Sequence, residues 1–244
     1  AYLVSALSKT EADVNVIMTE NACEFISPLV FETLTGNKCY VDTFDRNFKF
    51  DVEHISLAKK ADIFMIAPAT ANVIAKIANG IADDMLTTTF LASKCNKIVS
   101  PAMNTAMFEN QITQDNIAKL KKYGIGVVEP QNGLLACGDT GAGKMPEPDF
   151  LFDVIEREIA REKDMLGKKV LVTAGATMES LDPVRFLTNH SSGKMGFAIA
   201  KEAMLRGAEV TVVKANTTAE IPNFVKIVEV SSAKDMFDAV TALS

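Results

Sequence analysis

Short runs of β-branched and other apolar residues alternate along this chain with longer segments that have helical periodicity. Strands are expected at residues 14–18, 63–67, 97–100, 126–128, 169–173 and 209–213, and helices at residues 1–9, 51–62, 71–78, 82–94, 113–123, 149–164, 196–206 and 232–243. Such alternation is typical of a parallel sheet with helices on both of its faces. The pattern therefore predicts an α/β fold with Rossmann-like connections.

A charged stretch at residues 156–164 is followed by Gly167, and a predicted strand begins directly after it. We place a domain boundary near Leu166, which divides the chain into residues 1–166 and 167–244. The chain opens on a helical pattern, whereas a doubly wound domain normally begins with a strand and a phosphate-binding turn. We therefore expect the first strand of domain 1 to be missing from this sequence, and residues 167–244 to be the amino-terminal part of a second α/β domain.

The composition is that of a soluble globular protein. With 48% hydrophobic residues the chain can bury a substantial core, and no apolar run approaches the roughly 18 residues of a membrane span. A cytoplasmic location without a membrane partner is expected. The 25 basic and 31 acidic residues give a net charge of -6, which offers no basic field for nucleic acid. The cysteines have no paired spacing, so neither a disulfide framework nor a metal site is predicted.

Polar residues follow three of the predicted strands, namely Thr19, Thr70 and Asn104. Ligands of open α/β sheets bind beyond the carboxyl ends of the strands, so this rim is suited to a flat ring and to a phosphate. Helix capping by the same side chains explains each of them singly, but explains the three with their neighbours less well.

Residues 130–148 carry Cys137 among glycines and prolines, which are expected to exclude a regular element there. A loop of this length is typically a lid, a binding loop or disordered. Two leucines and an alanine precede the thiol, so the tip is suited to closing over an apolar ligand. A small buried cysteine in an irregular connection is the structural alternative.

His54 lies on the helix expected at residues 51–62, ahead of a strand whose far end belongs to the rim. A single helical histidine is more often structural, and the functional alternative is a base or an orienting group near neutral pH. Two segments resemble nucleotide-binding motifs but lack residues that these motifs require. Gly141 and Gly143 lack the third glycine of a dinucleotide fingerprint, and residues 192–195 lack the upstream glycine and the hydroxyl residue of a P-loop.

Three motifs together resemble those of the flavin-dependent cysteine decarboxylases: Ala-Pro-Ala-Thr-Ala-Asn at residues 67–72, Pro-Ala-Met-Asn at 101–104 and Ala-Cys-Gly-Asp at 136–139. The chain is more closely similar to the bifunctional bacterial coenzyme A enzymes, in which phosphopantothenoylcysteine decarboxylase is fused to phosphopantothenate-cysteine ligase. The resemblance implies a flavodoxin-like domain with FMN at a subunit interface, and hence a trimer or a tetramer of trimers.

The resemblance also implies a reaction, in which the thiol of phosphopantothenoylcysteine is oxidised to a thioaldehyde, carbon dioxide leaves, and the enethiol is reduced to phosphopantetheine. His54 matches the active-site histidine, and Asn104 matches the asparagine that holds the substrate carboxylate. Cys137 matches the proton donor of the reductive step, which suits a thiol with a pKa of about 8.5. Further matches are Met107 and Ala136 at the substrate, and Thr19, Ala69, Thr70, Asn72, Ala102 and Met103 at FMN.

Residues 173–196 resemble the opening of the ligase half, which activates phosphopantothenate with CTP, with Mg²⁺ expected as well, and then couples it to cysteine. Asn189 matches the asparagine linked to the acyl-cytidylate, and Ser191, Ser192 and Gly193 form a helix start suited to phosphate. The sequence departs from the family at Ala176, where proline is usual, and it ends before the later nucleotide-binding and lysine-containing motifs.

Two alternatives are weighed against this assignment. The first is a peptidyl-cysteine decarboxylase or a flavin prenyltransferase relative, neither of which is expected to carry residues 189–196. The second is a non-enzymatic regulatory subunit of a protein phosphatase. Such a protein is expected to lose catalytic residues and to carry an acidic tail, and this sequence shows neither feature.

Overall fold

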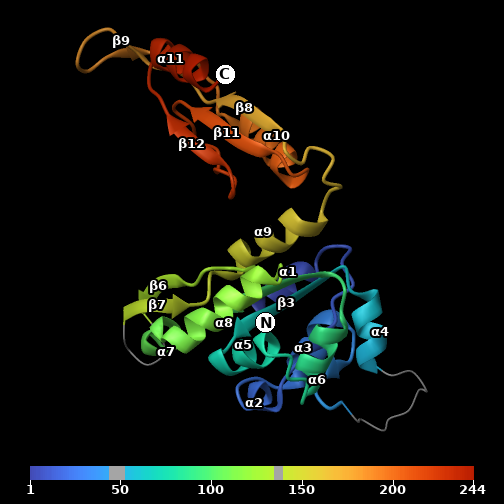
Figure 1. Ribbon diagram of the computed structural model, residues 1–244. Helices are drawn as coiled ribbons and strands as arrows, with labels where there is room; N and C mark the ends of the chain where they lie inside the picture. Colours follow the sequence, from blue (N-terminus) through green and yellow to red (C-terminus); the bar gives the residue numbers. More distant parts are fainter. Residues whose placement is uncertain (44–52, 135–139) are drawn as a thin grey trace. The chain divides into compact units, whose positions relative to one another are not determined.

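The computed structural model describes residues 1–43, 53–134 and 140–244. The chain forms two compact units, unit 1 with residues 1–152 and unit 2 with residues 153–244 (Figure 1). The division falls within helix α9 (Pro148–Ile159). The domain boundary near Leu166 stays a prediction.

Unit 1 is built mainly from short strands that alternate with helices. Its helices are α1 (Tyr2–Leu7), α2 (Glu20–Cys23), α3 (Pro28–Thr35), α4 (Glu53–Lys60), α5 (Ala71–Ala78), α6 (Met85–Ala92), α7 (Thr105–Glu109) and α8 (Gln111–Lys122). Its strands are β1 (Val16–Ile17), β2 (Cys39–Tyr40), β3 (Ile63–Ala69), β4 (Asn96–Pro101), β5 (Gly126–Val127), β6 (Gln131–Leu134) and β7 (Thr140–Lys144).

The first five strands of unit 1 pair only in parallel, as the sequence predicts. Strands β3, β4 and β5 form one parallel sheet with β4 in the middle, and β1 pairs with β2 in a second parallel sheet. Because the strands of each sheet run in the same direction, their carboxyl ends lie at one edge. The turns after β3 and β4 are thereby brought next to each other.

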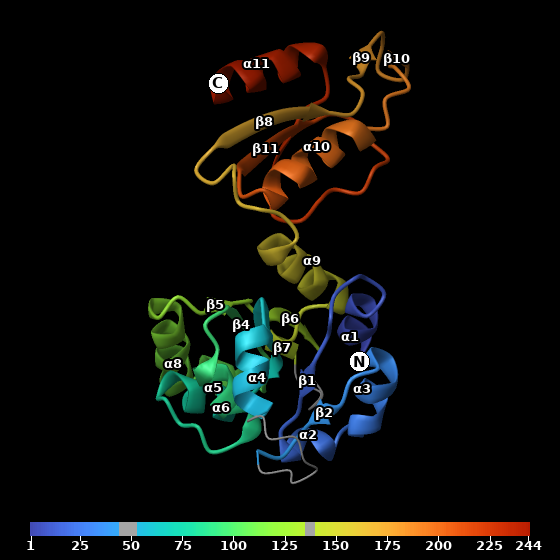
Figure 2. The same ribbon diagram turned by 90° about the vertical axis from the view of Figure 1, so that its right-hand side faces the viewer.

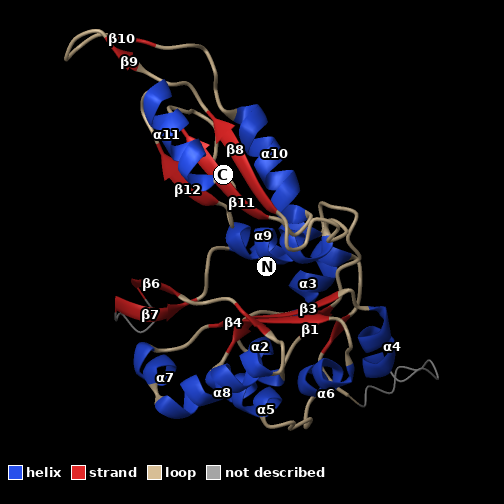
Figure 3. Cartoon of the chain, turned by 45° about the horizontal axis from the view of Figure 1, so that its top comes forward, coloured by secondary structure: helices blue, strands red, loops and turns tan. Residues whose placement is uncertain are grey.

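The core of unit 1 lies between the β3–β4–β5 sheet and helices α5, α6 and α8. Val99 of β4, Ile74 of α5 and Leu120 of α8 have no exposed surface. Each such burial contributes roughly 2 kcal/mol to folding. Phe64 and Phe90 meet edge to face, with ring centroids 5.4 Å apart. Helix α3 lies on the other side of the strands (Figure 3).

The expectation that residues 130–148 hold no regular element is wrong. Strands β6 and β7 form an antiparallel hairpin, in which Gly133 pairs with Gly141. The sequence disfavours a strand here because glycine adds little to pairing and to packing. In this hairpin the glycines of β7 lie where another part of the chain comes very close, the Thr105 side chain at Gly141 and the Met103 backbone at Gly143.

Unit 2 contains a three-stranded parallel sheet of its own. Strands β8 (Lys169–Ala174), β11 (Glu209–Lys214) and β12 (Lys226–Glu229) pair in the order β12-β11-β8. Helices α10 (Lys194–Leu205) and α11 (Ala233–Leu243) lie on opposite sides of this sheet (Figures 2 and 3). Strands β9 (Glu179–Ser180) and β10 (Phe186–Leu187) form a small antiparallel hairpin. The core packs α10 against β8 and β11.

All of the expected strands are present in the structure, and so are the expected helices. Besides β6 and β7, the short strands β2, β9, β10 and β12 and the helices α2, α3 and α7 were not predicted. In the described parts of the chain, no helix combines the length and the apolar character that crossing a membrane requires. The same residues contain no group of three or more histidine, cysteine and carboxylate side chains that could hold a metal ion.

Candidate functional site

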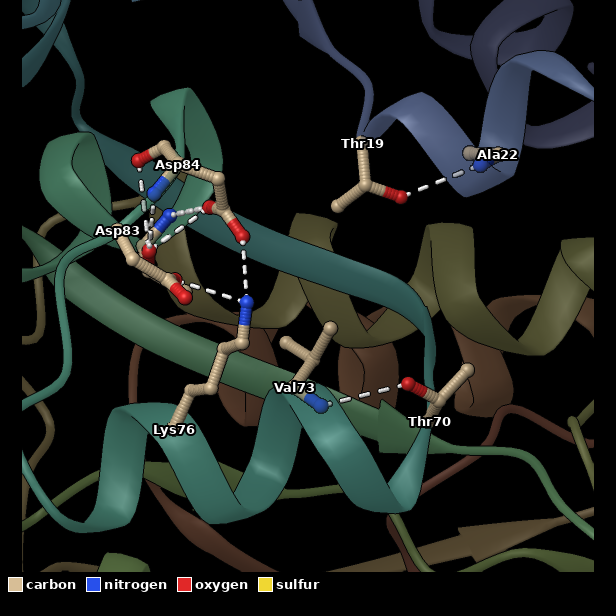
Figure 4. A network of polar contacts seen from close by, with 8 residues as sticks. Thr19, Ala22, Thr70, Val73, Lys76, Asp83 and Asp84 are labelled. Carbon is tan, nitrogen blue, oxygen red and sulfur yellow. Dashed lines mark hydrogen bonds and ion pairs between the residues drawn. The ribbon is translucent and has the colours of Figure 1, made fainter.

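Two of the predicted rim residues begin helices directly after parallel strands. Thr19 follows β1, and its hydroxyl oxygen accepts a hydrogen bond from the Ala22 backbone N–H at 3.2 Å. Thr70 follows β3, and its hydroxyl oxygen accepts one from the Val73 N–H at 3.3 Å (Figure 4). Both side chains therefore cap helices, as the capping interpretation of the sequence predicts.

The Pro-Ala-Met-Asn turn after β4 lies beside the turn after β3. The Ala102 N–H donates to the Ala69 carbonyl at 3.0 Å, which joins the two strand ends beyond the last regular pair. The Asn104 side chain caps α7 by accepting from the Ala106 N–H at 2.9 Å. The structure thus brings together the residues predicted after β3 with those predicted after β4.

The β6–β7 hairpin is attached to the same turn. The Met103 N–H donates to the Gly143 carbonyl of β7 at 3.1 Å. Two residues predicted for the site, Ala136 and Cys137, fall between the two strands of this hairpin and lie outside the described residues. Met107, predicted at the substrate, is half exposed on α7.

The rim fits a flat ligand with a polar edge. Thr70 and Asn72 are exposed, whereas Ala69 between the strand and the helix is fully buried. Ala102, in the turn after β4, is partly exposed and carries only a small side chain. Helix α5, which begins here, directs the positive end of its dipole towards the rim. These groups suit the polar edge of the isoalloxazine ring of FMN.

A polar cluster that the sequence analysis missed holds the turn between α5 and α6. The Lys76 ammonium contacts Asp83 at 2.8 Å and Asp84 at 3.2 Å (Figure 4). Asp84 caps α6 in a reciprocal capping box with Thr87. Burial raises the pKa of the Asp84 carboxyl, but hydrogen bonds from Thr87 and Lys76 outweigh burial and hold the pKa below its usual value. The Asp-x-x-Thr spacing is the signal that could have located this cap.

His54 is not brought near Asn104. It lies half-buried in the first turn of α4, and α4 and α7 occupy opposite ends of unit 1 (Figures 1 and 3). Within one copy of the chain, the described structure therefore does not assemble the histidine and the asparagine into one site.

A cavity of about 460 Å³ in unit 2 surrounds the start of α10. Its lining includes three of the predicted residues, Ser191, Ser192 and Gly193, together with His190 and Lys194. Gly193 has φ 80° and begins the helix without a side-chain cap. Asn189 does not line the cavity, but its side-chain oxygen accepts from the Ser191 N–H at 2.9 Å.

Two tight contacts fix this helix start. A Cβ on Gly193 would lie 2.6 Å from the Thr217 hydroxyl oxygen, and a Cβ on Gly175 would lie 2.4 Å from the Asn216 carbonyl. The Thr217 hydroxyl donates to the Ser192 carbonyl at 2.6 Å. The backbone N–H groups at the start of a helix attract anions, so this cavity is suited to phosphate.

Another cavity, of about 580 Å³, lies at the other end of the unit 1 sheet. It surrounds the amino ends of β4 and β5 and is lined by Lys94, Lys97 and Lys119. Helices α5, α6 and α8 end there, and lysines at helix ends offset the partial negative charge of the last carbonyls. None of the predicted site residues lines this cavity, so we do not assign the functional site to it.

The chain matches two protein families. Residues 1–160 match the family described as Flavoprotein, and residues 165–244 match the DNA/pantothenate metabolism flavoprotein C-terminal domain. The coenzyme A biosynthesis bifunctional protein CoaBC of Bacillus subtilis (strain 168) is 44% identical over 244 residues, which cover 99% of this chain and 60% of that protein. The chain thus spans about three fifths of the length of this relative.

Solved structures resemble the chain over most of unit 1. The FMN-dependent cysteine decarboxylase SpaF is 33% identical with a TM-score of 0.52, covering 59% of this chain and 80% of that one. A mutant PPC decarboxylase complexed with pantothenoylaminoethenethiol is 29% identical with a TM-score of 0.55, covering 62% and 86%. The predicted flavodoxin-like α/β fold is confirmed by these likenesses together with the parallel pairing.

Proposed function

Because the chain belongs to the flavoprotein family, we propose that unit 1 binds FMN and decarboxylates 4'-phosphopantothenoylcysteine to 4'-phosphopantetheine. One observation carries the proposal: the Ala102–Ala69 hydrogen bond joins the two motif-bearing turns into one exposed rim at the carboxyl edge of the sheet. The likeness to SpaF and to a PPC decarboxylase supports the same chemistry. Bound FMN would supply the two-electron acceptor that the cysteine thiol needs before carbon dioxide leaves, and would return those electrons afterwards.

The residues of this chain bind and orient the substrate and move its protons. Asn104 is held at the start of α7 by its bond to Ala106, and an amide there is suited to donate to the substrate carboxylate. Thr70 and Asn72 are exposed in the neighbouring turn after β3, where they would contact the flavin edge. Cys137 donates the proton of the last reductive step, because a thiol of ordinary pKa is protonated at neutral pH. His54 accepts a proton from the substrate thiol or orients it.

The separation of His54 from Asn104 supports self-association. Their helices lie at opposite ends of unit 1, so both residues reach one substrate only when they come from different copies (Figures 1 and 3). We therefore propose a trimer or a tetramer of trimers, with each decarboxylase site shared between neighbouring copies. A cytoplasmic location stays a prediction.

Unit 2 is proposed to belong to a CTP-dependent ligase that joins phosphopantothenate to cysteine. Its match to the pantothenate-metabolism domain and the cavity at the α10 start support this assignment. The uncapped N–H groups after Gly193 would hold a phosphate, and Mg²⁺ would accompany CTP. Because the chain covers 60% of its bifunctional relative, ligation is a proposal for the whole protein.

A turnover experiment tests the decarboxylase. The protein carrying this chain is expected to hold flavin with a yellow absorbance and to release carbon dioxide from phosphopantothenoylcysteine. Cys137→Ser should still release carbon dioxide but accumulate the enethiol, whereas His54→Asn should fail before release. Wild-type turnover in both variants would overturn the proposed roles of Cys137 and His54.

Mixing of variants tests the shared site. Co-refolding His54→Asn chains with Asn104→Asp chains should restore part of the activity, since some interfaces then combine an intact His54 with an intact Asn104. The matched control mixes His54→Asn with a chain that carries both substitutions, and it should restore none. Equal activity in the two mixtures contradicts a site shared between copies.

A further inference from the structure

Gly143 of β7 is in contact with both backbone polar groups of Met103. Its carbonyl accepts from the Met103 N–H at 3.1 Å, and a Cβ added to it would lie 2.2 Å from the Met103 carbonyl oxygen. Its φ of +134° is rarely adopted by residues with a side chain. Two constraints, one of space and one of backbone conformation, therefore act at the same residue.

Gly141 of the same strand rests on the residue after Asn104. A Cβ added there would lie 2.5 Å from the Thr105 hydroxyl oxygen and 2.9 Å from its methyl carbon. Gly133, which faces Gly141 across the hairpin, differs: its Cβ would meet only the flexible end of Lys144, at 3.1 Å. The requirement for glycine is thus confined to the strand that faces the Pro-Ala-Met-Asn turn.

The Thr105 hydroxyl shows how close this contact is. Its oxygen is buried and has no hydrogen-bond partner among the described residues. A buried hydroxyl without a partner costs stability, so such a group persists only where close packing around it compensates. The hairpin strand packs against it directly through Gly141.

We propose that Gly141 and Gly143 are positioning residues, which seat the β6–β7 hairpin on residues 103–105 and thereby fix Met103 and Asn104 at the rim. This inference rests on the proposed decarboxylase function. The seat holds the Met103 backbone by a hydrogen bond and limits the movement of Thr105, the neighbour of Asn104. A displacement of about 1 Å at a positioned group can lower turnover about a hundredfold.

A rescue experiment separates positioning from general instability. Gly141→Ala is expected to lower the decarboxylation kcat at least about tenfold, and the double variant Gly141→Ala/Thr105→Ala should recover most of it, because the two closest atoms are then removed. Gly143→Ala should lower kcat about a hundredfold and should not be rescued by Thr105→Ala, since its obstacle is backbone. Gly133→Ala is the matched control on the same hairpin, with an expected change below about twofold.

Hydrogen exchange of the Met103 amide gives a readout independent of turnover. Exchange of this amide should be slow in the wild type and in Gly133→Ala. It should be faster in Gly141→Ala and in Gly143→Ala, and slow again in the double variant Gly141→Ala/Thr105→Ala. Absence of rescue, or an equal loss in Gly133→Ala, overturns the proposed seat. A wild-type protein that protects the Met103 amide but releases no carbon dioxide would instead refute the decarboxylase function.

Discussion

The helices at the rim of unit 1 and helix α10 of unit 2 begin in different ways. At the rim of unit 1, the helices that follow β1, β3 and β4 begin with side-chain caps from Thr19, Thr70 and Asn104. In unit 2, α10 begins at Gly193 without a side-chain cap, and glycine contacts hold it against the end of β8. A capped start commits backbone N–H groups within the protein, whereas an uncapped start leaves them for an anion.

This difference refines the sequence-based expectation for the rim. Hydroxyl and amide side chains after the strands suggested donors for a phosphate, but those at Thr19, Thr70 and Asn104 accept from their own helices. The rim of unit 1 is therefore better suited to a polar ring edge. The start of α10 is the better phosphate site.

The largest effect is expected from placing a side chain at the uncapped start. Gly193→Ala adds strain at φ 80° and a contact of 2.6 Å with Thr217, which together should lower the stability of unit 2 by about 3 kcal/mol. Hydrogen exchange of the Val212 amide, in the buried middle strand of that unit, measures the change.

Gly207→Ala is the matched control, because Gly207 has φ +92° but its Cβ would meet nothing closer than 3.5 Å. It should cost only the conformational strain, about 1 kcal/mol. Equal losses in the two variants would mean that the contact with Thr217 does not hold the start of α10.

A smaller effect is expected from removing a cap at the rim. Thr70→Ala leaves the Val73 N–H without its partner and should lower the stability of unit 1 by about 1 kcal/mol, while Thr70→Ser should lose much less. Hydrogen exchange at the Val99 amide, in the buried middle strand of unit 1, reports the difference. Identical stabilities of the two variants would remove the contrast between capped and uncapped starts.

The smallest effect is a pH dependence at the capped start of α6. The pKa of the Asp84 carboxyl is held below its usual value, so its stabilisation is complete above the unfolded pKa and disappears as the pH falls through the folded pKa. The free energy of unfolding of the wild type should exceed that of Asp84→Asn by less than about 1 kcal/mol at neutral pH, and the gap should close as the pH falls below the ordinary aspartate pKa and through the folded one. Urea unfolding at a series of pH values measures it, and a gap that does not change with pH contradicts the role of the carboxylate.

Local sequence was sufficient where side chains alone determine the element. The short apolar runs of β3, β8 and β11 predicted strands of parallel sheets, and the motifs after β3 and β4 predicted one shared rim. The β6–β7 hairpin could not be predicted in this way. Gly141 and Gly143 are required there because Thr105 and Met103, from a distant part of the chain, leave no room for a side chain. The separation of His54 from Asn104 is likewise a property of the three-dimensional arrangement, which residue spacing does not contain.

The opposite placement of α4 and α7 also has a consequence for inheritance (Figure 1). In the proposed assembly each copy lends His54 to one neighbour and Asn104 to another. A copy that lacks both His54 and Asn104 would therefore inactivate two catalytic sites instead of one. When an allele with both substitutions is expressed beside the wild type, the loss of total activity should exceed the fraction of mutant copies, because each mutant copy also inactivates a site that a wild-type copy helps to form.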